Sequence, residues 1–177
     1  MQAMSTTLLY ALIMAIGQIV LTLVGYFLGY QTDKINQGTW FGFVPLIYAI
    51  VVYVLGIKAV REEDAGKYLT YGKGVSTGTM IALYSGLIGS IYAYIHFTYV
   101  NPEFTDYLVE ASRVKWAAAG MSDDRMEGAE KGIRMFTKPA IQAVVGLCIT
   151  MVLGVIIALI ASIFLKRNPP AENQVTA

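Results

Sequence analysis

The chain has 177 residues, of which 56% are hydrophobic and only 14% charged, and its formal net charge is +1. Soluble domains carry roughly 25% charged residues, so this composition excludes an ordinary water-soluble domain, and the near-neutral charge excludes a nucleic-acid-binding surface. A membrane span needs about 20 mostly apolar residues, and such runs cover most of the chain. The sequence predicts an all-α, polytopic membrane protein with one four-span domain over residues 1–168.

The first two spans are expected at residues 8–27 and 40–57. Neither contains Asp, Glu, Lys or Arg, the ionisable groups that proton relays and coupled transporters place within the membrane. Gln18 is the polar exception in the first span. It either hydrogen-bonds to a neighbouring helix or lines a polar path.

The connection to the third span contains GKYLTYGKGVSTG at residues 66–78, which looks like a phosphate-binding loop. That motif needs a second glycine where Tyr71 stands, and a Ser or Thr where Gly74 stands. We therefore predict no nucleotide site. Basic side chains in this connection are candidate contacts to anionic lipid headgroups: Arg61, Lys67 and Lys73.

The third span is expected at residues 75–100, and His96, the only histidine, lies near its end. Its aromatic neighbours favour an interfacial aromatic belt, with a pH-sensing or headgroup-contacting role as the alternative. One histidine without a nearby carboxylate predicts no metal site.

The connection at residues 102–137 is typical of two amphipathic helices in a hairpin. Asn101 is expected to be the N-cap of the first helix, Pro102 its first residue and Gly120 its end. Ser122 is expected to cap the second helix. We expect this hairpin to lie on the bilayer surface or to cap the bundle.

The fourth span is expected at residues 139–165, followed by a disordered cytoplasmic tail at residues 169–177. Small residues recur at every fourth position of the last two spans, a spacing that lets helices pack closely. These candidate packing residues are Gly74, Gly78, Ala82, Gly86 and Ser90, then Gly146, Thr150, Gly154 and Ala158. They favour packing within the monomer, with a dimer or partner-helix interface as the alternative.

The distribution of Lys and Arg predicts the orientation. Four lie between the second and third spans and two follow the fourth, whereas only Lys34 lies between the first and second. Because basic residues concentrate in cytoplasmic loops, we expect both termini in the cytoplasm and the hairpin outside.

Three segments carry a resemblance to a known family: GKYLTYGKGVSTGTMIALYSGLIGSIYAYIHFTYVNPEF, GMSDDRMEGAEKGIRMFTKP and the terminal IASIFLKR. They resemble the bacterial membrane family catalogued as domain of unknown function 4199, most specifically at residues 72–78, 101–102 and 120–139. The resemblance covers nearly the whole chain. It implies a four-span inner-membrane protein with an exposed helical segment before the last span. It brings no established activity, cofactor or catalytic residue. It also implies that the protein is encoded near glycosyltransferases that resemble polyprenyl-phosphate sugar synthases.

Three functions follow from these features. The leading one is a non-catalytic subunit that docks or scaffolds a membrane-protein partner or another copy of itself. The second is a lipid-handling protein for a polyprenyl-phosphate-linked sugar or another envelope lipid. The third is a membrane enzyme using residues 62–64 or His96, although no catalytic constellation supports it and no cofactor is expected.

Overall fold

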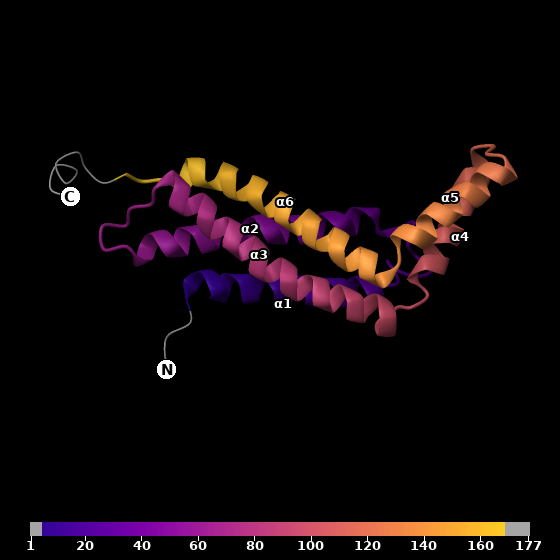
Figure 1. Ribbon diagram of the computed structural model, residues 1–177, viewed down its shortest axis with the longest axis horizontal. Coiled ribbons are helices and arrows are strands. Elements are labelled where there is room, and N and C mark those ends of the chain that lie inside the picture. The colour runs from indigo at the N-terminus through magenta and orange to yellow at the C-terminus, as the bar shows by residue number, and fades with distance from the viewer. Residues whose placement is uncertain (1–4, 169–177) are drawn as a thin grey trace. The chain divides into compact units, whose positions relative to one another are not determined.

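The computed structural model describes residues 5–168, and every regular element among them is helical (Figure 1). The α-helices are α1 Thr6–Phe27, α2 Phe43–Glu63, α3 Tyr71–Ile95, α4 Phe104–Ala118, α5 Asp123–Phe136 and α6 Pro139–Leu165. A 3₁₀ helix, Gly38–Gly42, precedes α2, and a π-helix, His96–Val100, follows α3. The all-α prediction is confirmed. The predicted tail at residues 169–177 lies outside the described residues.

Four helical stretches are long and apolar enough to cross a membrane: Thr6–Phe27, Gly38–Glu63, Tyr71–Val100 and Pro139–Leu165. The prediction of four spans is confirmed by their length and composition. The second helix continues past residue 57, and the third begins before residue 75. The helical hydrogen bonds continue beyond the apolar run. In α2 this extension is favoured because Arg61 in the last turn interacts favourably with the negative end of the helix dipole.

The described residues form two compact units. Unit 1 comprises residues 5–17, 47–87 and 148–168, and unit 2 comprises Gln18–Leu46 and Ile88–Leu147. Each unit is described by itself below.

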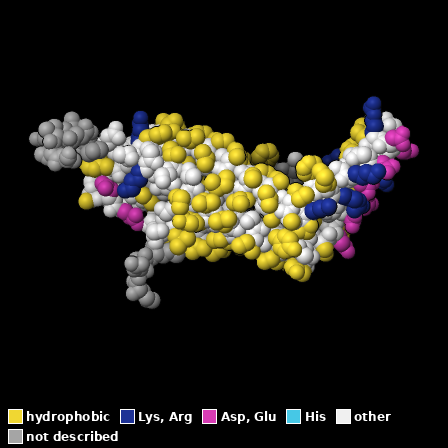
Figure 2. All heavy atoms as spheres, in the orientation of Figure 1, with side chains coloured by type: hydrophobic (Ala, Val, Ile, Leu, Met, Phe, Trp, Pro, Cys, Tyr) yellow, Lys and Arg dark blue, Asp and Glu magenta, His cyan; other side chains and the backbone are white. Residues whose placement is uncertain are grey.

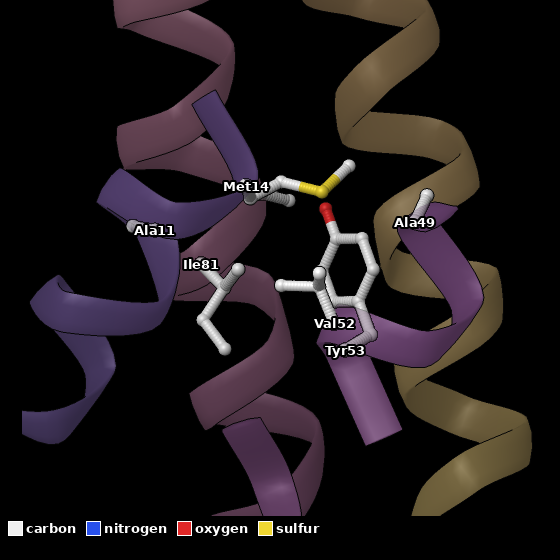
Figure 3. Packing of buried hydrophobic residues seen from close by; sticks show 7 residues of the cluster. Ala11, Met14, Ala49, Val52, Tyr53 and Ile81 are labelled. Carbon is white, nitrogen blue, oxygen red and sulfur yellow. The ribbon is translucent and has the colours of Figure 1, made fainter. Parts of the chain in front are cut away.

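Unit 1 contains two buried hydrophobic clusters. The larger one is shown in Figure 3 and consists of Ala11, Met14, Ala49, Val52, Tyr53, Ile81 and Ala82. The smaller one consists of Ile57, Leu69, Ala158 and Ala161. Most of these side chains are small or β-branched, so the backbones of the helices approach closely. Because lipid tails are as apolar as these side chains, close van der Waals packing between the helices stabilises the unit in a membrane.

In unit 2, α4 and α5 lie side by side and are joined by a short turn (Figure 1). Gly120 in this turn has a φ of 71°, the left-handed conformation that glycine favours at a helix end, as the sequence predicts. The predicted start of the first helix was wrong, because α4 begins at Phe104 and its N-cap is Glu103. Asn101 instead belongs to the end of the π-helix, where its backbone N–H donates to the His96 carbonyl and its side-chain amide donates to the Gln31 carbonyl.

Candidate functional site

The small residues of α3 and α6 face each other in unit 1. A Cβ atom added at Gly154 would lie 2.6 Å from the Ala82 Cβ atom and would overlap the Tyr53 hydroxyl. An added Cβ at Gly78 would overlap Ala158, and one at Gly74 would lie 2.5 Å from the Ser162 Oγ atom. Gly78 and Gly154 therefore require glycine, because the Cβ atoms of Ala158 and Ala82 fill the space, whereas the Ser162 hydroxyl at Gly74 can rotate away.

The other predicted packing residues differ in their surroundings. Gly86 is buried in unit 1 and Thr150 is half-buried there. Ser90 is half-buried in unit 2. Gly146 has open space around it, since a Cβ added there would meet no atom within 4 Å. The small residues at this spacing therefore include some that make close helix contacts and some that do not.

Gln18 has a partner in unit 2. Its side-chain amide nitrogen donates to the Pro45 carbonyl at 3.1 Å. Gln18 lies on α1 and Pro45 on α2, so this hydrogen bond crosses between two helices. It matches the first of the two alternatives that the sequence left open for Gln18.

His96 is fully buried at the start of the π-helix in unit 2. Its Nε2 atom lies 2.9 Å from the Gln31 Oε1 atom, and its Nδ1 atom lies 3.1 Å from the Tyr92 hydroxyl. The Gln31 amide nitrogen donates to the Thr22 carbonyl at 2.9 Å, which leaves Oε1 to accept from His96. The network therefore assigns the proton of the neutral ring to Nε2, with Nδ1 accepting from Tyr92.

The cluster around His96 extends to the π-helix end. Asn101 is buried, and its side-chain amide donates to the Gln31 carbonyl at 3.3 Å. The rings of Tyr26 and Phe97 meet the imidazole edge-on, with centroids 5.8 and 5.1 Å away. The sequence identified His96 as a candidate polar site but did not identify Gln31, and it gave Asn101 a capping role. A glutamine in a connection carries no signal of its own, and only the folded contact reveals its role.

At one end of unit 1, the connection between α2 and α3 is fastened to the end of α6. Leu69 and Arg167 exchange two backbone hydrogen bonds of 2.9 Å each, in an antiparallel bridge. The Asp64 carboxylate accepts from the backbone N–H groups of Gly66 and Tyr68 at 3.2 and 3.1 Å, so it shapes the turn. Lys67 has a φ of 54° within this turn.

The three predicted headgroup contacts differ in their partners. Arg61 pairs with Glu62 at 2.9 Å, and Lys67 pairs with the same carboxylate at 3.2 Å. Lys73 is exposed near the start of α3, and the structure pairs it with no acid among residues 5–168. Two of the three predicted cations therefore already have a carboxylate partner.

Ion pairs join α4 and α5 in unit 2. Arg134 donates to Asp106 on α4 at 2.8 Å and to Glu130 at 2.9 Å, and Arg113 on α4 also pairs with Glu130 at 2.9 Å. The Thr105 hydroxyl donates to the Thr137 hydroxyl at 2.9 Å. The Arg134 guanidinium holds the pKa of the Glu130 carboxyl below its usual range. The network therefore fixes the two helices against each other.

Apolar side chains remain exposed on this helix pair. Val114 is 65% exposed, Phe136 is 63% exposed and Met135 is 49% exposed. An open hollow of about 460 Å³ lies nearby, lined by Arg113, Ala117, Asp123, Asp124, Met126 and Glu127. Within residues 5–168, no group of three or more His, Cys, Asp or Glu side chains is arranged to hold a metal ion.

The four long apolar helices define a multi-pass membrane protein in a lipid bilayer. The family model described as protein of unknown function (DUF4199) matches residues 9–167. Because this match covers most of the chain, the protein belongs to that family, and the resemblance seen in the sequence is confirmed. No curated protein and no solved structure matches the chain.

Proposed function

We propose that the protein is a non-catalytic membrane subunit that docks a membrane-protein partner through the α4–α5 pair. The observation that carries this proposal is the combination of a fixed helix pair with exposed apolar side chains. The pair lies outside the four candidate spans, and its ion pairs hold the two helices together. Val114, Met135 and Phe136 nevertheless remain exposed. Exposed apolar side chains on a fixed surface are typical of interaction sites.

The charges of the pair suit a protein partner. Exposed residues of both signs lie on the same two helices as the apolar side chains, namely Asp106, Glu110, Arg113, Lys115 and Arg125. Protein interfaces combine apolar side chains with polar ones in this way. Another copy of the chain fits this description as well as a different protein does.

The proposal includes a location in the bacterial inner membrane, with both termini in the cytoplasm and the amphipathic α4–α5 pair outside. The Lys and Arg bias of the short connections supports this orientation. Replacing Cys148, the single cysteine, with Ser allows a new cysteine to be placed at Ala118 or at Lys58. A membrane-impermeant thiol reagent applied to intact cells should label the first and spare the second. The reverse pattern would overturn the orientation.

The docking proposal is tested by photocrosslinking in native membranes. A photoreactive residue is placed at Val114 or Phe136, and a control is placed at Phe164 on α6, which is 81% exposed. We expect one protein adduct at the first two positions and lipid adducts at Phe164. The Arg134→Gln variant should weaken the protein adducts, because it loosens the pair that presents both side chains.

The identity of the adducts distinguishes a different protein partner, a second copy of the chain and a lipid. An adduct of twice the chain mass would make the partner another copy. Lipid adducts at all three positions would overturn docking, and enrichment of a polyprenyl phosphate among them would favour the lipid-handling alternative.

A further inference from the structure

The end of unit 1 that holds the Leu69–Arg167 bridge carries an excess of positive charge. Its basic residues are Lys58, Arg61, Lys67, Lys73, Lys166 and Arg167, against the acids Glu62, Glu63 and Asp64. Figure 2 shows Lys and Arg side chains in dark blue at this end, beside yellow apolar surface. None of these residues belongs to the α4–α5 pair, so this surface has no part in the proposed docking.

The acids at this end are already engaged. Glu62 pairs with Arg61 and Lys67. Glu63 accepts a hydrogen bond from the Thr6 hydroxyl, and Asp64 accepts from two backbone N–H groups in the turn. None of the three pairs with Lys73, Lys166 or Arg167, and three acids against six cations leave this end with an excess of positive charge.

Three of those cations, Lys73, Lys166 and Arg167, are exposed, and the structure gives them no acidic partner within residues 5–168. Contacts in unit 1 hold their backbones near one another. Arg167 is bridged to Leu69, the Lys166 N–H donates to the Ser162 carbonyl, and Ser162 packs on Gly74, the residue after Lys73.

Apolar side chains lie beside these cations. Phe164 and Ile163, which precede Lys166 on α6, are 81% and 54% exposed. The ligand that suits both features is amphiphilic, with a phosphate for the cations and hydrocarbon for the face of α6. A freely diffusing phosphate would use the cations alone.

We propose that Lys73, Lys166 and Arg167 bind the headgroup phosphate of an anionic phospholipid, whose acyl chains lie along the exposed face of α6. Lysine and arginine at a membrane surface attract anionic lipids. The three residues come from two helix ends that the backbone bridge holds together, so the site depends on the fold of unit 1. It is distinct from the predicted contacts at Arg61 and Lys67, both of which pair with Glu62.

The test is native mass spectrometry of the full chain in detergent, titrated with phosphatidylglycerol or with zwitterionic phosphatidylcholine. The test variant is Lys166→Gln/Arg167→Gln, which leaves the backbone bridge intact. The matched control is Lys115→Gln/Arg125→Gln, which removes the same charge from exposed residues of α4 and α5. We expect the wild type to prefer phosphatidylglycerol. Each cation removed from the site should weaken that binding about fivefold, hence about 25-fold for the test variant.

The control variant and Lys166→Arg/Arg167→Lys should retain the wild-type affinity for phosphatidylglycerol. Equal losses in the test and control variants would overturn the proposal, since only total charge would then matter. Displacement of the lipid by inorganic phosphate would also overturn it, because the site would then accept free phosphate. If the test variant lost its helical circular dichroism, Lys73→Gln alone would decide: a fivefold loss supports the site, and no loss overturns it.

Discussion

The Nε2 atom of His96 lies 2.9 Å from the side-chain oxygen of Gln31, and this contact joins the π-helix after α3 to the connection after α1. Asn101, at the end of the π-helix, makes a second contact between the same segments, because its side-chain amide donates to the Gln31 carbonyl at 3.3 Å. Two irregular segments of unit 2 therefore hold each other through buried polar groups. Buried polar groups are costly when a partner is removed, so the contact constrains both segments.

Replacing Gln31 with Leu should destabilise the protein, because the buried His96 N–H loses its acceptor. An unsatisfied buried donor costs about 1–3 kcal/mol, and for a chain of this size that lowers the unfolding midpoint by a few degrees. Thermal unfolding of the purified protein in detergent measures this. Gln37→Leu is the control, since Gln37 is exposed in the same connection. Equal effects of the two substitutions would contradict the role of Gln31.

Two glycines of α6 should respond differently to alanine. Gly154→Ala places a Cβ atom against Tyr53 and Ala82 and should cost about 1–3 kcal/mol through overpacking. Gly146→Ala meets no atom within 4 Å and should be neutral or stabilise by up to about 1 kcal/mol, because alanine favours the helix. Unfolding midpoints of the two variants provide the comparison. If both variants were stabilised, the close approach of α3 and α6 would be wrong.

Replacing Arg134 with Gln should loosen α4 against α5. The substitution removes the bonds to Asp106 and Glu130, whereas the control Lys131→Gln removes only the pair with Glu127 on the same helix. Hydrogen exchange of backbone amides should therefore accelerate several-fold over α4 and α5 in the first variant. Exchange in the control should match the wild type. Faster exchange in Lys131→Gln alone would contradict this prediction, because the ion pair within α5 would then matter more than the pairs between the helices.

The Glu130 carboxyl should make the α4–α5 contact sensitive to acid. Because Arg134 lowers its folded-state pKa below the usual 4.5, its stabilisation is complete above about pH 4.5 and is lost as the pH falls through the lowered value. The fluorescence of Trp116 on α4 should change in that acidic range. In Glu130→Gln the change should be smaller. If the pH dependence of the fluorescence were unchanged in Glu130→Gln, a different carboxyl would be responsible for the transition.

The membrane spans were predictable because a long apolar run is read directly from the sequence. Their helical ends were not, since polar residues such as Glu63 and Tyr71 continue a helix beyond the apolar run. Asn101 has the residue type of an N-cap, but its side-chain amide donates to the Gln31 carbonyl and α4 begins only at Phe104. These contacts depend on the tertiary fold and on the π-helix, which has no sequence signature of its own.

The candidate sites were predictable to different degrees. The spacing of Gly74, Gly78 and Ala82 follows from helix periodicity, and these residues do face α6 in unit 1. The partners of charged residues do not follow from spacing. Sequence reasoning grouped Arg61, Lys67 and Lys73 as headgroup contacts, whereas the structure pairs the first two, but not Lys73, with Glu62. The partners Gln31 and His96 lie in different segments, and only tertiary structure brings them together.

The bridge between Leu69 and Arg167 has a consequence for biosynthesis. The ribosome makes Leu69 long before Arg167, so the backbone N–H and carbonyl of Leu69 lack this partner while α3 to α6 are being synthesised. Leu69 is only 1% exposed in the finished protein, and its side chain cannot be covered by α6 until that helix exists. Release of the nascent chain before Arg167 would leave this connection open, whereas synthesis of α6 through Arg167 supplies the partner that closes it.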